Sequence, residues 1–405
     1  MSRRRHPRLH VPPPQHNRFE RLSQPAEVAG LRVLEGQTFG VEIELTSPLG
    51  APNQTGLEYG RPEWKSIALS IIRAIEPVAT LPVDREPRNY HEVDDWERWR
   101  VEFDRSAGWE VVSPVLCNQE GIAELINVLS ALNALGRKSR HLTINHRTGL
   151  HITLGSGINS DKQVHGLVKL VQVLEPGLFP LVAPSRLYEF KNGRYFQKLR
   201  NKYCRPLCES DGSLSDLTSC SKNKEESSLR YRTVNFSHLN DPNPHIEIRM
   251  HHGTTRYSEV IAWISLWMTL LNRARYRWPE KGRTGRVFPN DNMTINGDTA
   301  RLEDLFTLLS RLDIHLDPRL KEILSQQRSE RLESWKKIVP RRVQSWKRWW
   351  PSSAGRPPII CSYPTGGHSR RGWMRHNPSR SGFSRSSRSE PRTISRHKVH
   401  SRRHI

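Results

Sequence analysis

Short segments of this 405-residue chain alternate strictly between apolar and polar side chains. The clearest is FGVEIEL at 39–45, which places three aliphatic residues on one face of an extended chain and Glu42 and Glu44 on the other. Another strictly alternating segment is GLHITLG at 149–155, and further strand-like segments lie at 99–104, 109–116, 231–239 and 245–251. Because a strand with one apolar face is stable only when that face is covered, the pattern predicts a sheet that is backed by other elements.

The segments between these strands carry apolar residues at helical spacing. They lie at 62–76, 120–135, 161–174, 256–275, 301–312 and 318–338. Two strand pairs are separated by short turns, Ser-Ala-Gly at 106–108 and Asp-Pro-Asn-Pro at 241–244, which favours hairpins. We therefore expect an α+β fold in which a largely antiparallel sheet is backed by helices. Trp263 and Trp267, one helical turn apart, are expected in its core.

The formal net charge of +23 lies almost entirely at the two ends of the chain. Residues 1–22 carry +5 and residues 336–405 carry +17, which leaves +1 for residues 23–335. Nucleic-acid binding, which a strongly basic chain suggests, is therefore a prediction for the ends alone. We expect a flexible basic arm at 1–30, a folded domain at 31–280, a linker with C-terminal helices at 281–339 and a disordered Arg/Ser-rich tail at 340–405.

No apolar run approaches the ~20 residues of a membrane span. The best candidate, 260–271, is twelve residues long and contains Ser265 and Thr269. No apolar run follows the first arginines, so we expect no Sec signal. The five cysteines are scattered and odd in number, which fits a reducing compartment, so we expect a cytoplasmic protein. The five cysteines include no CxxC pair, which disfavours structural zinc; a partial metal site at Cys204, Cys208 and Cys220 is the alternative.

The polar faces of the predicted strands carry chemically related side chains. They are Glu42, Glu44, Glu110, His151, Thr153, Asn235, Glu247 and Arg249. A face that meets only solvent usually carries Lys, Thr, Arg and Gln in no order, whereas this set supplies four carboxylates, one imidazole and one guanidinium. Clustered carboxylates repel one another and need cations, and oxygen donors with one imidazole suit Mg²⁺ or Mn²⁺. Divalent ions beside an arginine are what phosphoryl transfer requires; the alternative for each strand is an ordinary solvated face.

Five segments, taken in order, resemble the motifs of the amidoligase family, which is related to glutamine synthetase and glutamate–cysteine ligase. They are FGVEIEL, the Asp104-x-Ser106 strand that runs into WEVVSPVL, TGLHITLG, RYRTVNF and HIEIRMHHGT, between Thr38 and Arg275. The resemblance implies a glutamine synthetase-like catalytic fold in 31–280. It also implies a carboxylate–amine ligase that uses ATP and Mg²⁺ (or Mn²⁺) and forms an amide through an acyl phosphate. Its substrates would be small-molecule or peptide carboxylates and amines.

The resemblance further implies roles for individual residues. The implied metal ligands are Glu42, Glu44, Glu110, His151 and Glu247. The implied catalytic residues are Arg249, Glu247 and Glu110, and the implied ATP- or substrate-binding residues are Arg249, Asn235, Tyr231, Thr153 and Ser113. One position departs from the family, because Thr153 stands where the third motif usually has a second histidine, and a hydroxyl is a poor Mg²⁺ ligand. The loop-rich stretch 183–228 is a candidate lid that would shield the acyl phosphate from water.

A second hypothesis belongs to another class of function. The chain would be a catalytically inactive member of this family that binds nucleic acid or a protein partner through its basic ends. Trp346, Trp349, Trp350 and Trp373 lie among the cations near the C-terminal end, and indole rings stack on bases. The simplest alternative is a solvated end with no binding role. His251 and His252 are also open to two interpretations, as substrate contacts or as residues of an exposed turn.

Overall fold

The computed structural model describes residues 31, 33–49, 58–89, 96–158, 160–191, 194–207, 230–277 and 302–336. The predicted arm at 1–30 and the predicted tail at 340–405 lie outside the described residues, as do Cys208 and Cys220 of the alternative metal site.

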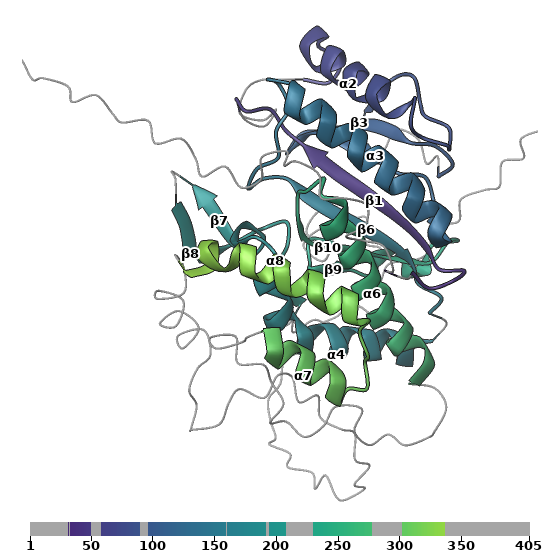
Figure 1. Ribbon diagram of the computed structural model, residues 1–405, viewed down its shortest axis with the longest axis vertical. Coiled ribbons are helices and arrows are strands. Elements are labelled where there is room, and N and C mark those ends of the chain that lie inside the picture. Colours follow the sequence, from purple (N-terminus) through teal and green to yellow (C-terminus); the bar gives the residue numbers. More distant parts are fainter. Residues whose placement is uncertain are drawn as a thin grey trace, which may run out of the picture. The chain divides into compact units, whose positions relative to one another are not determined.

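A sheet of eight strands forms the centre of the described part of the chain (Figure 1). Seven strands follow the order β2-β3-β4-β1-β6-β10-β9, and β5 pairs with the beginning of β1. Their bounds are β1 Thr38–Leu45, β2 Arg88–Asn89, β3 Arg100–Asp104, β4 Gly108–Val112, β5 Leu116–Cys117, β6 Gly149–Gly155, β9 Val234–Asn235 and β10 His245–His252. All these neighbours pair antiparallel except β2 and β3, which confirms the largely antiparallel sheet expected from the sequence.

Six α-helices occur among the described residues. They are α2 Pro62–Ile75, α3 Asn118–Lys138, α4 Asp161–Leu178, α6 Tyr257–Arg277, α7 Leu302–Arg311 and α8 Pro318–Lys336. Each overlaps a segment whose apolar spacing predicts a helix, so the α+β class is confirmed. Local chemistry determines where some of these helices begin. Helix α2 begins at Pro62, which loses no hydrogen bond there because the N–H groups of a helix's first turn have no partner within the helix. Helix α4 is capped by the Ser160 side chain, which accepts a hydrogen bond from the Gln163 N–H. None of these helices combines the length and the apolar composition that a membrane crossing requires.

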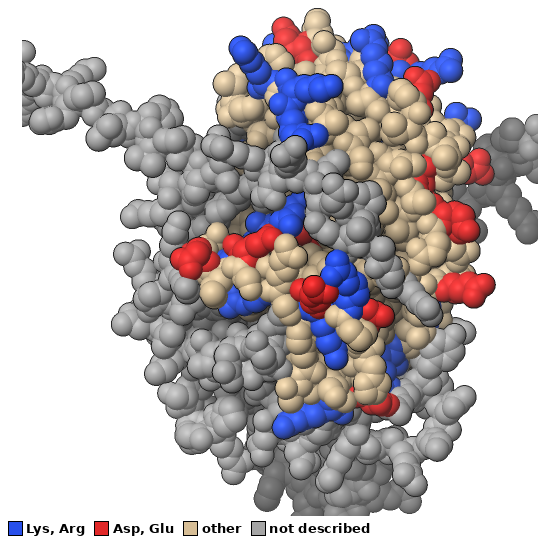
Figure 2. Space-filling model, viewed as in Figure 1, with Lys and Arg blue, Asp and Glu red and all other residues tan. Residues whose placement is uncertain are grey.

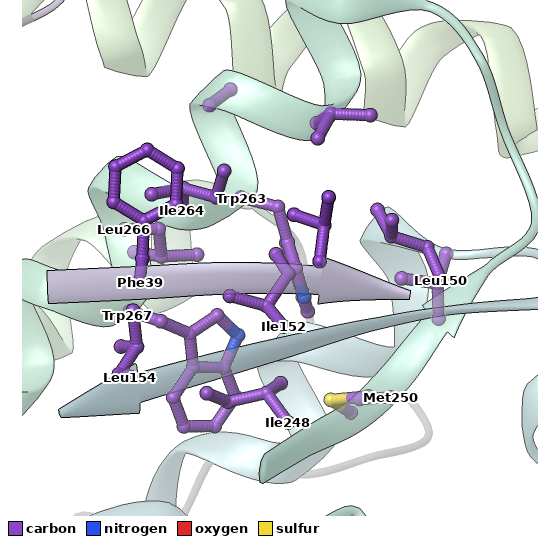
Figure 3. Packing of buried hydrophobic residues seen from close by; sticks show 14 of the residues in the cluster. Phe39, Leu150, Ile152, Leu154, Ile248, Met250, Trp263, Ile264, Leu266 and Trp267 are labelled. Atoms are coloured by element: carbon purple, nitrogen blue, oxygen red, sulfur yellow. The ribbon is translucent and has the colours of Figure 1, made fainter. Parts of the chain in front are cut away.

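The aliphatic faces of the central strands pack against α6. Figure 3 shows side chains of β1, β6 and β10 lying beside side chains of that helix. The labelled residues are Phe39, Leu150, Ile152, Leu154, Ile248 and Met250 from the strands, with Trp263, Ile264, Leu266 and Trp267 from the helix. Trp263 and Trp267 are 0 % exposed, which confirms their expected place in the core. Burying apolar surface stabilises the fold by ~25 cal/mol per Å², so the aliphatic faces of the strands pack against the helices. The polar side chains of the same strands lie on the opposite face of the sheet.

The C-terminal helices pack on the other helices instead of standing apart. Helix α8 contacts α6, and α7 contacts α4. Trp335 of α8 is 1 % exposed, and its indole Nε1–H donates to the backbone carbonyl of Val182 at 2.8 Å. The segment 302–336 is therefore tied to the turn that follows the short 3₁₀ helix η2 (Phe179–Leu181).

The stretch 183–228, expected to be loop-rich, holds regular structure in its first part. The 3₁₀ turn η3 (Pro184–Arg186) leads into a hairpin of β7 (Tyr188–Lys191) and β8 (Arg194–Arg200). This two-stranded sheet is separate from the main sheet, so it does not share the aliphatic face that packs on the helices. The alternation of apolar and polar residues that identifies the other strands is therefore weak in β7 and β8. Residues 208–229, the rest of the candidate lid, lie outside the described part of the chain.

The strand expected at 231–239 is much shorter than the sequence suggests. Strand β9 contains only Val234–Asn235, because β10 pairs with it only at Glu247 and Ile248. A 3₁₀ turn, η6 (Ser237–Asn240), follows directly. The antiparallel partnership of this segment with β10 is nevertheless the one expected from the sequence.

Candidate active site

The pairing register of the sheet brings the polar side chains of neighbouring strands together. On β1, Glu42 lies opposite His151 of β6, and Glu44 lies opposite Glu110 of β4. Glu110 in turn lies opposite Glu102 of β3. Directly opposed residues have Cβ atoms ~5 Å apart, so the register alone converts four separate strands into one cluster of side chains.

His151 stands at the centre of this cluster. Its Nδ1 lies 2.9 Å from an oxygen of Glu42, 3.5 Å from Glu247 and 3.9 Å from Glu110. Its Nε2 lies 3.6 Å from Glu44. The five residues predicted as metal ligands are therefore brought together, and all except Glu42 are buried.

Two sets of three side chains in the cluster have ligand atoms close enough to hold a cation. One set is Glu42, Glu110 and His151, and the other is Glu44, Asp104 and Glu110; within each set the ligand atoms lie within 4.8 Å of one another. Five of the six places are filled by carboxylates and one by imidazole, which is a donor set for Mg²⁺ or Mn²⁺. Glu110 belongs to both sets, so the arrangement fits a pair of divalent cations that share one carboxylate.

Burial and mutual repulsion raise the pKa values of the two innermost carboxyl groups. Burial, with the nearby Asp104 carboxylate, raises the pKa of Glu44 to about 7. Burial, followed by the negative charges of Glu42 and Asp104, raises the pKa of Glu110 well above its usual range. Both groups thus favour a proton in the absence of a metal, and a divalent cation is the natural replacement for that proton.

The imidazole of His151 is neutral at physiological pH. Burial, together with the positive charge of Arg249, lowers its pKa well below the ordinary value. A neutral imidazole keeps one ring nitrogen with a lone pair, which is the form that binds metals.

Glu247 and Arg249 form a second group at the β10 side of the cluster. The two side chains form an ion pair, and the Asn235 amide donates to the other oxygen of Glu247 at 2.9 Å. Burial alone would raise the pKa of Glu247, but the positive charge of Arg249 holds it below its usual range, so this carboxylate is ionised. The guanidinium of Arg249 also lies over the ring of Tyr231, 5.6 Å from its centroid.

The two predicted hydroxyl residues differ in their surroundings. Thr153, half-buried on β6, lies opposite Glu247 on one side and Gly40 on the other. The Ser113 hydroxyl accepts from the Val41 N–H at 2.9 Å and donates to the Pro114 carbonyl at 2.8 Å. Ser113 thus holds β4 against β1, and a binding role for either hydroxyl stays a prediction.

Three charged residues of the site were not singled out by the sequence analysis. Glu102 and Arg100, both buried on β3, form an ion pair with each other. They follow the same alternation of apolar and polar residues as Glu42 and Glu44, so the sequence of segment 99–104 already places both on the polar face. Arg186 is also buried, but it projects from the η3 turn, where no periodic pattern marks a residue.

The interpretation of His251 and His252 as residues of an exposed turn is wrong, and a role as substrate contacts stays a prediction. The two residues are 1 % and 3 % exposed at the end of β10, with their rings stacked at 4.3 Å between centroids. The pairing of β10 with β6 shifts between Ile248 and His251, which ends the regular alternation there. His252 Nδ1 accepts from the Ala183 N–H at 3.2 Å, so this side chain contacts the turn before η3.

Comparison with known proteins gives three findings. No curated protein matches the chain in sequence. Two solved structures resemble it. "Crystal structure of novel glutamine synthase homolog" is 15 % identical with a TM-score of 0.36, and the match covers 80 % of this chain and 70 % of that one. "GmaS/ADP complex-Conformation 1" is 14 % identical with a TM-score of 0.37, and the match covers 80 % of this chain and 74 % of that one. Residues 35–271, more than half of the chain, match the family described as "Putative amidoligase enzyme". This segment contains the sheet and every residue of the acidic cluster, and the chain therefore belongs to the amidoligase family.

Proposed function

We propose that the chain is an ATP-dependent carboxylate–amine ligase whose reaction takes place on the polar face of the sheet. The observation that carries the proposal is the convergence of Glu42, Glu44, Glu110 and Glu247 on His151. Four carboxylates gathered from three strands around one neutral imidazole on a fourth have no structural purpose that apolar side chains would not serve better. They suit a site that binds cations and handles phosphate.

Glu42, Glu110 and His151 would hold one Mg²⁺ or Mn²⁺ ion, and Glu44, Asp104 and Glu110 a second. When bound, such ions neutralise phosphate oxygens and polarise the phosphorus–oxygen bonds. Glu247, ionised beside the first set, is expected to complete it. Because the pKa values of Glu44 and Glu110 are raised, a bound metal would compete with protons for these two carboxylates.

Arg249 is expected to stabilise the phosphoryl group during transfer. An oxygen of the substrate carboxylate would attack the γ-phosphorus of ATP, the bond to the ADP oxygen would break, and an acyl phosphate would form. The amine nitrogen would then attack the acyl carbon, lose its proton and displace phosphate, which leaves an amide. Glu247 and Tyr231 orient the Arg249 guanidinium, so its charge is already in place when negative charge develops.

The second hypothesis, an inactive adaptor that binds nucleic acid through its ends, finds no support in the described residues. The ends lie outside them. On the face shown in Figure 2, cationic and anionic side chains of the described residues are interspersed, so this view shows no broad patch of one sign among them. The partners that the ligase proposal expects are a carboxylate and an amine, each a small molecule or a peptide.

The proposal is tested by amine-dependent release of ADP. The full chain would be incubated with Mg²⁺, ATP and pools of amino acids, polyamines and peptides. We expect Glu247→Gln and Arg249→Ala to lower the rate roughly 10²–10³-fold, as the loss of an electrostatic stabiliser does in other enzymes. Glu120→Gln, which removes an exposed carboxylate on α3, is the matched control and should keep the wild-type rate. Wild-type rates in both site variants, or no amine-stimulated release from any pool, would refute the ligase.

A further inference from the structure

Arg186 is a buried cation at the β6 side of the acidic cluster. Its side chain is almost fully enclosed, and its Nη2 donates to the backbone carbonyl of Arg249 at 2.6 Å. The position of the guanidinium follows from Gly149: a Cβ at this glycine would lie 3.2 Å from each terminal nitrogen of Arg186 and 3.1 Å from His151 Nε2. The guanidinium groups of Arg186 and Arg249 therefore both lie near His151.

Unlike the other two arginines of the site, Arg186 forms no ion pair with any carboxylate of the described residues. Arg249 pairs with Glu247 and Arg100 pairs with Glu102, whereas the Nε of Arg186 has no hydrogen-bond partner. Buried guanidinium groups are normally satisfied by a carboxylate, because an uncompensated charge in the interior is costly. The guanidinium acts on Glu44 through its charge and on the Cys204 thiol, but neither is an ion-pair partner, and the Nε–H donor stays available for a ligand.

The turn that carries Arg186 is fixed from two sides. The Val182 carbonyl accepts from the Trp335 indole of α8 at 2.8 Å, and the Ala183 N–H donates to His252 Nδ1 of β10 at 3.2 Å. Both contacts are buried. A cation that is anchored in this way loses little freedom when it binds a ligand, which is the arrangement of a prepared binding group.

A buried ion network stands behind His252. Because Nδ1 of His252 accepts a hydrogen bond, its proton lies on Nε2, which faces the Glu259 carboxylate at 3.6 Å. Glu259 is paired with Arg331 of α8 at 2.5 Å and with Arg256 at 3.5 Å. Helix α8 lies beyond the family match, which ends at residue 271. It is nevertheless connected to the Arg186 turn directly, through Trp335, and indirectly, through the ion pair of Arg331 with Glu259.

The charges of the site show what Arg186 is prepared to bind. The polar face carries six carboxylates (Glu42, Glu44, Glu102, Asp104, Glu110 and Glu247) and three guanidinium groups (Arg100, Arg186 and Arg249). With all of them ionised the face is negative, but two divalent cations reverse its sign. An anion is then required, and a guanidinium matches two oxygens on one carbon or one phosphorus.

We propose that Arg186 binds a substrate oxyanion in the active site, either a phosphoryl group of the nucleotide or the carboxylate that becomes the amide. This inference rests on the proposed ligase function and adds a binding residue to it. Neither the sequence motifs nor the alternation of the strands assigns Arg186 any role.

The test measures anion binding to the full chain by calorimetry, with Mg²⁺ present. The phosphoryl probes are ADP and a non-hydrolysable ATP analogue, the carboxylate probes are succinate and L-glutamate, and adenosine is the neutral control. We expect Arg186→Met to weaken the binding of one class of probe about tenfold or more, and Arg186→Lys to weaken it less. Arg73→Gln, which removes an exposed arginine on α2, should bind every probe as the wild type does. The class that is weakened identifies the oxyanion.

Thermal unfolding distinguishes a binding role from a structural one. If Arg186 is held for a ligand, then Arg186→Met replaces a buried cation that has no ion-pair partner among the described residues with an apolar side chain of similar length. The melting temperature without ligand should then be no lower than that of the wild type. Variants that both melt far below the wild type, or that both bind all probes with wild-type affinity, overturn the proposal.

Failure of this inference differs from failure of the ligase. A wild-type chain that binds the ATP analogue but releases no ADP with any amine refutes the ligase and leaves the Arg186 measurement valid. If the wild-type chain releases ADP and Arg186→Met has the same KM and kcat as the wild type, then the binding role of Arg186 is refuted and the ligase is not. A wild-type chain that binds neither class of anion refutes both.

Discussion

At the scale of single residues, the site is built from groups that destabilise the empty protein. Glu44 and Glu110 are buried among other carboxylates, and their raised pKa values measure how unfavourable their ionised forms are. Residues selected for stability alone would not be placed there. The unfavourable charge is therefore a signature of function, and it can be measured without knowing the substrate.

Replacing Glu44 with Gln should stabilise the metal-free protein, and more so as the pH rises. The pKa of Glu44 is about 7 in the fold, above its ordinary value of 4.5, so the folded state holds this proton more tightly than the unfolded state. The stabilisation of the folded state by protonated Glu44 is fully present below pH 4.5, the pKa in the unfolded state, and is lost as the pH rises through 7, the pKa in the folded state. Glutamine keeps its neutral form throughout, so the free energy of unfolding of Glu44→Gln relative to wild type should rise by on the order of 2–3 kcal/mol between pH 4.5 and pH 8.

Denaturant unfolding in EDTA at several pH values measures this difference. The comparison of variant with wild type cancels the titration of groups that do not interact with Glu44. Glu120→Gln, on the exposed surface of α3, should show no such trend. A difference between Glu44→Gln and wild type that is constant with pH would contradict the account of Glu44.

At the scale of elements, each central strand separates packing from chemistry. In β6, Leu150 and Ile152 point into the core while His151 between them points into the site. The period of two makes this separation possible, since adjacent side chains of a strand lie on opposite faces. The sequence therefore predicted which residues of each strand are available for the site. It did not predict the order of the strands, since register and neighbours depend on contacts between segments far apart in the chain.

Ile152→Ala tests this separation. Ile152 is 0 % exposed and lies beside α6, so we expect a loss of roughly 2–5 kcal/mol in the free energy of unfolding from the lost apolar contacts and the cavity. Mg²⁺ affinity of the folded fraction should stay within a factor of two, because β6 pairs with β1 at His151 and with β10 at the residues on either side of it. Val115→Ala, at a side chain that is 50 % exposed, is the control, and equilibrium unfolding with calorimetric Mg²⁺ titration gives both quantities. An Ile152→Ala protein with wild-type stability would contradict the packing described for β6.

At the scale of the whole molecule, metal binding should be coupled to folding. A ligand that binds only the folded state stabilises it by RT ln(1 + [L]/Kd), which is about 2.7 kcal/mol at one hundred times Kd. Mg²⁺ should therefore raise the melting temperature, and the rise should be larger at pH 8 than at pH 6, because protons on Glu44 and Glu110 compete with the metal at the lower pH. Glu110→Gln should abolish most of this rise, since Glu110 belongs to both cation sets.

Differential scanning fluorimetry at constant ionic strength checks this coupling. Sodium replaces magnesium in the reference samples, so that screening is equal in both. Glu120→Gln should keep the full rise. A Glu110→Gln protein that responds to Mg²⁺ as the wild type does would show that the cations bind elsewhere.

The sequence by itself determined the helices, the central strands and the residues on each strand's polar face, because these depend on local period and composition. Its ordered motifs also determined the family, through Glu42, Glu110, His151 and Glu247. Only the tertiary structure decided that Glu110 is shared by two cation sets and that Arg186 reaches the cluster from a turn. Those features arise from pairing register and from the docking of α8 on the turn, which are contacts between distant segments that no local pattern specifies.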